Sequence, residues 1–291
     1  MGKKTILITG ASGFIGRNLA EQLAKSFGVS APNRSELDLL DAAAVQAYMK
    51  DGQFDAVVHC AGIGSARNSN AEGLFEKNLR IFKNVAGCRK FFGKMIQVGS
   101  GAEYDKRIPL VRVQEKEFGK HVPADEYGLC KYECSKYIEE ADGITCLRLF
   151  GCFGKYEDYS SRFISNAICR SLFGFPISIA NRNVIFSYLY VDDFARIVEH
   201  FIGHDGRHKF YNAVPDETAD LLSIANMVNE ISGKELSIIV KKPGMGNEYS
   251  GGNSRLREEV PKFRFTPMKD GVGKLYSWYK SNKASVDSGK L

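Results

Sequence analysis

The sequence has little of what marks a membrane-spanning or secreted protein. Charged side chains interrupt its longest apolar runs well before the roughly 18 residues that a membrane span requires. The opening MGKKTILITG lacks the cleavage pattern of a signal peptide. The seven cysteines are odd in number and form no CxxC pair, which indicates reduced thiols rather than a disulfide framework. These absences predict a cytoplasmic protein that has no membrane partner.

A concentrated basic surface is also missing. The 40 Lys and Arg residues are scattered along the chain and nearly balanced by 34 Asp and Glu, which leaves a formal net charge of +6. Proteins that bind nucleic acid usually gather their cations on one face or one helix, so no nucleic-acid partner is expected. With 291 residues and 44% hydrophobic content, the chain can bury a sizeable core.

What the sequence does contain is a regular alternation of short apolar runs and segments of helical periodicity. TILIT precedes IGRNLAEQLAKS, and FDAVVHCAG precedes LFEKNLRIFKNVAGCRKF and KMIQVGS. The apolar runs do not alternate polar with apolar residues, as expected for parallel strands covered on both faces. This order predicts an α/β fold with a doubly wound parallel sheet, which binds ligands at the carboxyl ends of its strands.

A glycine-rich segment, residues 9–16 (TGASGFIG), separates the first apolar run from the first helical segment. Gly10 permits a tight turn, Gly13 lets a pyrophosphate approach the backbone, and Gly16 permits close packing of helix on strand. The N-terminus of the following helix offers free N–H groups to the phosphates. The segment therefore predicts a Rossmann-like dinucleotide site. Further cofactor-binding residues expected in this turn are Ser12, Phe14 and Ile15.

The GxxGxxG spacing resembles that of the extended short-chain dehydrogenase/reductases of the NAD-dependent epimerase/dehydratase type. The resemblance extends over nearly the whole chain, including residues 59–62 (HCAG) beside the expected cofactor and the closing segment 255–279. It implies an NAD(P)-dependent enzyme that acts on a nucleotide-linked sugar, and a homodimer. The further cofactor contacts that it implies are Asp38, Leu39, Cys60, Ala61, Gly62 and Asn78.

The domain organisation changes near residue 150, where the sequence gains aromatic residues and loses strand signals. We expect residues 1–154 to form the NAD(P)-binding Rossmann domain. Residues 155–291 should form mostly a smaller C-terminal substrate-binding lobe, with 184–205 returning to the first domain. Asp192 or Asp193 is expected to cap the returning helix. The polar tail after residue 282 is expected to be frayed.

The side chain that meets the adenosine ribose decides between NAD and NADP. Glu36 falls about 20 residues past the glycines, where an acidic side chain would bind the ribose of NAD. Arg34 follows the second apolar run more closely, and a guanidinium there can bind a 2′-phosphate in bidentate fashion. Residues 33–48 also resemble the matching part of sugar-nucleotide reductases that use NADP. We therefore favour NADP as the cofactor, with NAD as the alternative.

Tyr127 and Lys131 are four residues apart in a segment of helical periodicity, so both side chains project from one face. Hydride transfer at a carbinol carbon requires a proton to move at the same oxygen, and a nearby ammonium helps a phenol to release one. Ser100 follows the run KMIQVG, where the resemblance implies a hydroxyl that binds the substrate oxygen. We predict Ser100, Tyr127 and Lys131 as catalytic residues. Tyr127 and Lys131 should also contact the cofactor, and Ser100 the substrate.

The two residues after Ser100 bear on the type of reaction. Dehydratases of this kind carry an Asp-Glu pair there, because elimination of water needs a further acid and base. This chain has Gly101 and Ala102 instead, so dehydration is disfavoured. A 4-keto reductase and a C4 epimerase need the same Ser, Tyr and Lys, and the sequence leaves both reactions open.

The expected substrate contacts depart from the common pattern. Gly151 stands where many relatives have Asn, and Phe186 where many have Arg, so no known sugar or base can be transferred to this chain. A diphosphate needs cations or helix N-termini. We therefore expect substrate contacts at Gly151, Arg162, Arg182 and Arg255, although each arginine also suits a plain surface position.

Two alternatives accompany this interpretation. His59 suits a packed residue at a strand end better than a metal ligand, because no second ligand has suitable spacing, and no metal is expected. A non-catalytic protein of the same fold that senses NAD(P) is the alternative to an enzyme. The complete set of Ser100, Tyr127 and Lys131 argues against it, since a sensor gains nothing from a proton donor.

Overall fold

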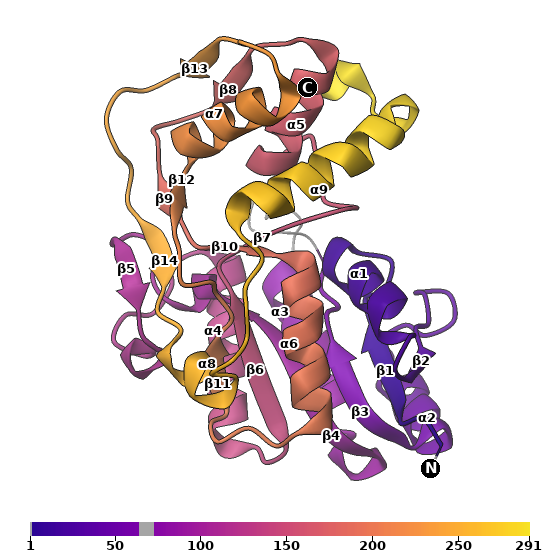
Figure 1. The fold of residues 1–291 in the computed structure, drawn as a ribbon. Helices are drawn as coiled ribbons and strands as arrows, with labels where there is room; N and C mark the ends of the chain where they lie inside the picture. Colours follow the sequence, from indigo (N-terminus) through magenta and orange to yellow (C-terminus); the bar gives the residue numbers. More distant parts are fainter. Residues whose placement is uncertain (1, 64–72) are drawn as a thin grey trace.

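The computed structural model describes residues 2–63 and 73–291. Its centre is a six-stranded parallel sheet with the strand order β11-β6-β4-β3-β1-β2 (Figure 1). Successive strands extend to one side of β1 and then, from β3 on, to its other side, so the winding reverses between β1 and β3. The prediction of a doubly wound parallel sheet is confirmed. Its strands are β1 (Thr5–Thr9), β2 (Gly28–Ser30), β3 (Phe54–His59), β4 (Phe92–Ser100), β6 (Ile144–Leu149) and β11 (Phe210–Asn212).

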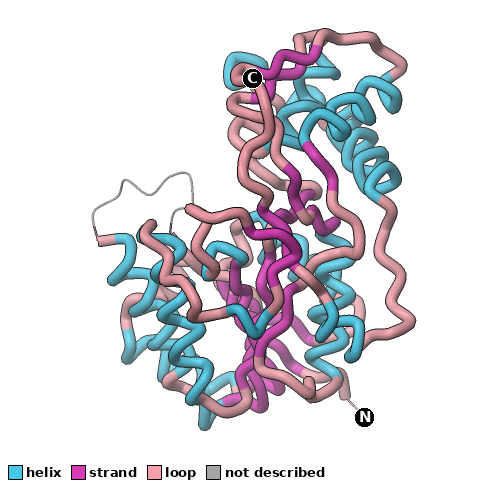
Figure 2. Tube along the Cα trace, turned by 90° about the vertical axis from the view of Figure 1, so that its left-hand side faces the viewer, coloured by secondary structure: helices cyan, strands magenta, loops and turns pink. Residues whose placement is uncertain are grey.

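Helices cover both faces of this sheet (Figure 2). On one face α1 and α6 pack on Ile8 and Val58, and on the other α2, α3 and α4 pack on Leu7 and Val57. Neighbouring residues of a strand point to opposite faces, so Leu7 and Ile8 enter different cores. This explains why the apolar runs are continuous. The helices are α1 (Phe14–Leu23), α2 (Ala42–Gly52), α3 (Leu74–Ala86), α4 (Glu126–Glu140) and α6 (Val191–Gly203).

A smaller lobe lies beyond the carboxyl ends of the strands (Figure 1). Three helices, α5, α7 and α9, share one core that includes Phe153, Ile168 and Val228. A mixed sheet of order β12-β9-β14-β5 joins the lobe to the segment that follows β4. The remaining elements are β5 (Leu110–Val113), β7 (Gly151–Phe153), α5 (Phe163–Phe173), β8 (Ile177–Ile179), β9 (Ile185–Phe186), β10 (Tyr188–Tyr190), β12 (Ala219–Asp220), α7 (Leu221–Ser232), β13 (Ile238–Val240), β14 (Tyr249–Gly251), α8 (Ser254–Glu259) and α9 (Met268–Ser281).

The chain crosses between the main body and the lobe more than once. After α6 it forms β11 at the edge of the main sheet, paired in parallel with β6, and α8 later returns to contact β11. We therefore propose that the segment of residues 155–291 that returns to the Rossmann domain does not end at residue 205 but extends as far as β11.

The prediction that an aspartate caps the returning helix is wrong. Asp192 and Asp193 lie inside the first turn of α6, and neither accepts a bond from the backbone of that helix's N-terminus. Asp193 instead accepts hydrogen bonds from the backbone and the hydroxyl of Thr266 at 2.6 and 2.8 Å, and Asp192 accepts one from Gln22 at 2.9 Å. The two carboxylates therefore fasten α6 to the segment before α9 and to α1.

The prediction of a frayed C-terminal tail is also wrong. Residues 283–291 form two short 3₁₀ turns, and Val286 is buried in the core of the lobe. The backbone N–H of Asp287 donates to the phenol of Tyr159 at 2.9 Å. Val286, Leu291, which packs against the same core, and the hydrogen bond to Tyr159 thus anchor this segment.

Candidate active site

The glycine turn after β1 depends on the absence of side chains. Gly10 has a φ of +70°, and a Cβ there would come within 2.7 Å of the backbone of Ala61. A Cβ on Gly16 would overlap the carbonyl oxygen of Gly10. The backbone N–H of Gly13 closes the turn by donating to Gly10 O at 3.0 Å, and α1 starts at Phe14 without a side-chain cap. The turn therefore presents the start of α1 at the carboxyl end of β1.

A cleft of about 290 Å³ opens beside this turn at the point where the strand order reverses. Such a position is where doubly wound sheets bind nucleotides. The cleft is not lined by four of the predicted residues, which belong to the turn and to the start of α1: Gly13, Phe14, Ile15 and Gly16. The lining residues that the sequence predicted are Gly10, Ser12, Arg34, Asp38, Leu39, Ala61 and Gly62.

Of Arg34 and Glu36, only Arg34 lines this cleft. Arg34 is exposed and lines the cleft. The carboxylate of Glu36 accepts a hydrogen bond from the backbone N–H of Asn33 at 2.7 Å, which ties it into the local turn. Of the two side chains proposed to meet the ribose, the structure therefore places Arg34 at the cleft.

A second cavity of about 130 Å³ adjoins the first and shares Ala61 and Gly62 with it. Cys60, Asn78, Tyr127 and Lys131 also line it. The side chain of Asn78 accepts from the backbone N–H of Ile63 at 2.7 Å and donates to its carbonyl at 2.9 Å. Asn78 therefore fixes the loop between the two cavities.

Helix α4 delivers Tyr127 and Lys131 to this second cavity. Asp125 caps the helix by accepting from the backbone N–H of Gly128 at 3.0 Å. The ammonium of Lys131 donates to the carbonyl oxygen of Val98 at 2.9 Å. Burial alone would lower the pKa of Lys131, but the charges of Tyr127 and of nearby Cys134 and Glu103 outweigh it and raise the pKa. Lys131 is therefore a fixed cation beside the phenol.

Ser100 ends β4 and begins a single 3₁₀ turn. Its hydroxyl accepts from the backbone N–H of Ala102 at 3.1 Å, while its own backbone N–H donates to Glu103 at 2.8 Å. These two bonds form a capping box. Only 8% of Ser100 is exposed. The hydroxyl therefore has a fixed position at the carboxyl end of the sheet.

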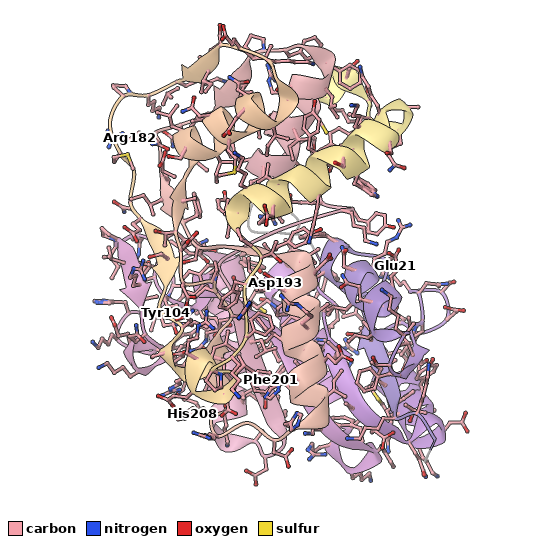
Figure 3. The ribbon with its side chains drawn as sticks, viewed as in Figure 1. Glu21, Tyr104, Arg182, Asp193, Phe201 and His208 are labelled. Atoms are coloured by element: carbon pink, nitrogen blue, oxygen red, sulfur yellow. The ribbon has the colours of Figure 1, made fainter. Side chains whose placement is uncertain are left out.

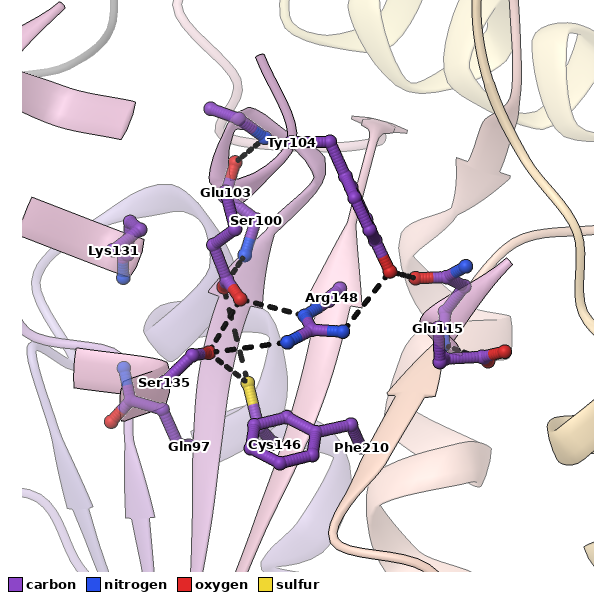
Figure 4. Close-up of polar contacts among 12 residues, drawn as sticks. Gln97, Ser100, Glu103, Tyr104, Glu115, Lys131, Ser135, Cys146, Arg148 and Phe210 are labelled. Carbon is purple, nitrogen blue, oxygen red and sulfur yellow. Dashed lines mark hydrogen bonds and ion pairs between the residues drawn. The ribbon is translucent and has the colours of Figure 1, made fainter. Parts of the chain in front are cut away.

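A buried charged cluster supports that turn (Figure 4). The carboxylate of Glu103 accepts from Arg148 Nε at 2.6 Å and from the hydroxyl of Ser135 at 2.5 Å. Arg148 Nη1 donates to the phenol of Tyr104 at 3.0 Å, and that phenol donates to Asn212. None of these residues was among the predicted site residues. The one available signal was Arg148 inside the apolar run TCLRLF, because a buried arginine needs an acidic partner.

Tyr249 of β14 was also not among the predicted site residues. Its strand lies against the 3₁₀ turn that follows Ser100, and its ring packs on Phe150 with 5.0 Å between the ring centroids. Burial, followed by the charge of Tyr127, raises the pKa of Tyr249, although Ser100 lowers it in part. Tyr249 therefore lies beside the turn that Ser100 begins. No local motif marks it, because it reaches this turn from a distant part of the chain.

The four predicted substrate contacts are dispersed. Gly151 packs against Tyr188, where a Cβ would come within 2.7 Å of the ring. Arg162 is exposed at the start of α5, and Arg182 is exposed at the left edge of the lobe (Figure 3). Arg255 donates to the carbonyl oxygen of Phe210 on β11 at 3.4 Å. The structure does not bring these four together around Ser100.

His59 is a packed residue at the end of β3. It is 1% exposed, and its Nδ1 lies 2.7 Å from the hydroxyl of Thr9. Within residues 2–63 and 73–291, no group of three or more His, Cys, Asp or Glu side chains is arranged to hold a metal ion. None of the helices in those ranges has the length and apolar character needed to cross a membrane.

A reversal of strand order, a glycine turn at a helix start and a cleft between them define a dinucleotide-binding protein of the Rossmann class. The sequence pattern of the NAD dependent epimerase/dehydratase family matches residues 6–213. The chain belongs to this family.

Named relatives agree with that assignment. The chain is 43% identical over 176 residues to a GDP-L-fucose synthase of Azorhizobium caulinodans, and the match covers 56% of each chain, little more than half of that relative. Among solved structures, UDP-glucose 4-epimerase of Thermotoga maritima has a TM-score of 0.84 at 20% identity and covers 96% of this chain and 99% of its own. A dTDP-4-dehydrorhamnose reductase of Bacillus anthracis, in complex with NADP, has a TM-score of 0.81 at 18% identity with the same coverage. These two likenesses concern the fold.

Proposed function

We propose that the protein is an NADPH-dependent reductase that converts the 4-keto group of a nucleotide-linked sugar to a hydroxyl. The observation that carries this proposal is that Tyr127 and Lys131 line a cavity that adjoins the cleft lined by Arg34. The GDP-L-fucose synthase and the dTDP-4-dehydrorhamnose reductase named above support the substrate class.

The residues of the cleft suit a dinucleotide that carries a 2′-phosphate. The glycine turn would hold the pyrophosphate, Asp38 and Leu39 the adenine, and Arg34 the 2′-phosphate. Glu36 does not line the cleft, and its carboxylate accepts a hydrogen bond from the backbone N–H of Asn33. When bound, NADPH supplies the hydride for the reaction. An enzyme that consumes this reductant fits net reduction better than epimerisation, which regenerates its cofactor in each turnover.

The side chains divide the remaining work. Tyr127 donates the proton to the substrate oxygen, and the cation of Lys131 stabilises the phenolate that remains. Ser100 donates a hydrogen bond to the same oxygen and orients it. Dehydration would require an additional acid and base after Ser100. The carboxylate within that turn, Glu103, is committed to Arg148 and Ser135.

The nucleotide sugar would lie between the main body and the lobe. We propose that the lobe binds its nucleotide, with the exposed Arg162 and Arg182 as candidate contacts for the diphosphate. Arg255 and Gly151 fit this role less well, because both are engaged with neighbouring residues. We retain the homodimer as a prediction from the resemblance.

The test is a panel of GDP-, dTDP-, UDP- and CDP-linked 4-keto sugars with NADPH and with NADH, in which nicotinamide absorbance and product identity are followed together. We expect one 4-keto sugar to be reduced, with stoichiometric loss of NADPH. Tyr127→Phe should lower kcat by about 10²- to 10⁴-fold and leave NADPH affinity within twofold.

Other outcomes of the panel contradict the proposal in recognisable ways. A C4 epimer formed from a 4-hydroxy sugar without net loss of NADPH would assign the epimerase reaction. Tight NADPH binding without hydride transfer to any sugar nucleotide would favour the non-catalytic sensor. Full activity of Tyr127→Phe would remove the phenol from the reaction.

A further inference from the structure

Two cysteines of α4 line the second cavity beside the predicted catalytic residues. The side chains that α4 contributes to this cavity occupy positions i, i+3, i+4 and i+7, which form one face of a helix. They are Tyr127, Cys130, Lys131 and Cys134. The proposed reaction uses the phenol and the ammonium and gives no role to the two thiols. The thiol of Cys130 therefore shares a cavity with the proposed proton donor and a fixed cation.

Gln97 of β4 also lines this cavity, and its side chain carries a buried acceptor. Gln97 is 2% exposed, and its amide nitrogen donates to the carbonyl oxygen of Val98 at 3.1 Å. The ammonium of Lys131 donates to the same carbonyl at 2.9 Å. Within the described part of the chain, no group donates to Gln97 Oε1. A buried acceptor without a donor is costly, so the cavity favours a small polar molecule that carries hydrogen-bond donors.

Cys130 is the thiol of this chain that ionises most easily. All seven cysteines lie in the part of the chain that the structure describes, and the pKa of Cys130 is the one among them that is lowered. Its interaction with the thiol of Cys134, together with the charge of Lys131, outweighs burial. The pKa values of the other cysteines are raised, and burial brings those of Cys60 and Cys169 to about 12. The thiolate is the reactive form, so we expect Cys130 to react before the others.

We propose that Cys130 is a site of oxidation by hydrogen peroxide that enters the second cavity, where Gln97 binds the peroxide, and that a dinucleotide in the adjoining cleft shields the thiol. The inference goes beyond the reductase function and requires only that the cleft binds NAD(P). The cleft and the cavity share Ala61, Gly62 and Ile63. A cofactor that extends from the cleft to Tyr127 passes over this shared boundary, so the cofactor-free protein is the form that reacts.

The groups of the cavity divide the work of this step. Gln97 Oε1 accepts a hydrogen bond from the peroxide. The thiolate sulfur of Cys130 attacks one peroxide oxygen, so that an S–O bond forms and the O–O bond breaks. The ammonium of Lys131 stabilises the leaving hydroxide, which takes up the proton that Cys130 released and departs as water. The sulfur is oxidised by two electrons to a sulfenic acid, and the peroxide is reduced.

The main test exposes the cofactor-free protein to hydrogen peroxide for increasing times and then unfolds it in the presence of iodoacetamide. Mass spectrometry measures the fraction of each cysteine that is still a thiol. We expect Cys130 to be lost about tenfold faster than Cys60, which lines the same cavity, or Cys169 in the core of the lobe. Saturating NADP should slow the loss of Cys130 by about tenfold or more, because few molecules then have a free cleft.

The outcomes of this test separate the parts of the inference. Loss of Cys130 no faster than that of Cys60 would overturn the assignment of the oxidation site. Equal rates at Cys130 with and without bound NADP would overturn the shielding. Failure of NADP to bind, measured by titration of the same sample, would instead count against the proposed cofactor, while the rate at Cys130 still decides the oxidation site.

Cofactor titration of a serine variant tests the consequence of oxidation without any turnover. After peroxide treatment the unmodified protein should bind NADPH about tenfold more weakly and recover with dithiothreitol, because a sulfenic acid in this cavity is polar and is reduced by thiols. Cys130→Ser should keep its affinity under the same treatment. Cys88→Ser is the matched control, because serine can replace the bond that Cys88 donates to the carbonyl of Asn84, and it should lose affinity as the unmodified protein does. Loss of affinity in Cys130→Ser would overturn the inference.

Gln97→Leu tests the group that binds the peroxide. Leucine has a similar size and no acceptor, so oxidation of Cys130 by peroxide should slow by about three- to tenfold. Methyl methanethiosulfonate has no hydrogen-bond donor, so its rate of reaction with Cys130 should change by less than about twofold. Equal rates with peroxide in the two proteins would remove Gln97 from the step. Slower reaction with both reagents would show that the substitution blocks the cavity, and it would overturn the role of the hydrogen bond.

Discussion

Glu103 and Arg148 form a fully buried ion pair directly beneath Ser100, with 2.6 Å between Glu103 Oε2 and Arg148 Nε. The side chains are 1% and 0% exposed. Glu103 also accepts from the backbone of Ser100 and from Ser135, so its carboxylate is saturated with donors. Charges are costly to bury unless they are paired in this way. The pair thus connects the stability of the main body to the geometry of the candidate active site.

Removing one member of the pair should be strongly destabilising. In Glu103→Ala the guanidinium of Arg148 stays buried without its counter-charge, which should lower the free energy of unfolding by on the order of 3–5 kcal/mol. Urea titration measures this loss. The control is Glu139→Ala, which breaks the solvent-exposed pair with Lys136 and should cost about 0.5 kcal/mol or less. Similar losses of the free energy of unfolding in Glu103→Ala and Glu139→Ala would show that leaving Arg148 buried without its partner is no more costly than breaking an exposed pair.

The main sheet was predictable because local signals and the global fold agree. The run Ala56, Val57, Val58 reads as a strand covered on both faces, and the structure buries all three in β3. The glycine turn was equally predictable, since Gly10 and Gly16 each have a steric reason to be glycine. Motifs of this kind use residues that are adjacent in the sequence, and so one stretch of sequence contains the whole signal.

The rest depended on contacts between distant parts of the chain. Tyr249 lies beside the turn after Ser100 because β14 joins β5 and β9 in a sheet that the sequence pattern did not predict. The sequence pattern indicated Asp193 as a possible helix cap, but its carboxylate accepts from the backbone N–H and the hydroxyl of Thr266 instead. Val286 gave no periodic signal, yet the lobe core has room for it. Local propensity does not contain such tertiary choices.

Arg34 should decide the preference between the two nicotinamide cofactors. Arg34→Ala removes charge-assisted bonds to a 2′-phosphate, and so NADPH affinity should fall about 10- to 100-fold while NADH affinity stays nearly constant. Fluorescence titration with both cofactors measures the ratio. Arg17→Ala serves as the control, because Arg17 is exposed on α1 and pairs with Glu21. Equal weakening of both cofactors in Arg34→Ala would end the argument for NADP.

Substitution of Gly16 by alanine should destabilise the protein, whereas substitution of Gly273 by alanine should stabilise it. A methyl group on Gly16 overlaps the carbonyl of Gly10, so Gly16→Ala should lose about 1–3 kcal/mol of stability and most of its affinity for NADPH. Nothing lies within 4 Å of a Cβ on Gly273, inside α9. Gly273→Ala should therefore gain about 0.5–1 kcal/mol, with unchanged cofactor binding. Thermal unfolding of the two variants tests the predicted changes in stability, and cofactor titration tests the predicted changes in NADPH affinity.

His59 should make the protein less stable in mild acid. Burial, aided by the cation of Lys131, lowers the pKa of His59 to about 3. In the unfolded chain the same ring would titrate at about 6.5. Between these two pKa values the ring is protonated in the unfolded chain and neutral in the folded protein. The contribution of neutral His59 to the free energy of unfolding is thus fully present above about pH 6.5. It is lost as the pH falls toward about 3, at roughly 1.4 kcal/mol per pH unit.

The variant that isolates this effect is His59→Asn, compared with the unmodified protein by urea unfolding at about pH 7.5 and about pH 5. The unmodified protein should lose roughly 2 kcal/mol more than the variant over that interval, because only it carries the buried ring. His121→Asn controls for the removal of a histidine as such, since His121 is exposed. If His59→Asn and the unmodified protein lose stability in parallel, His59 takes up its proton in the folded state as readily as in the unfolded one, and its burial has no part in the response to acid.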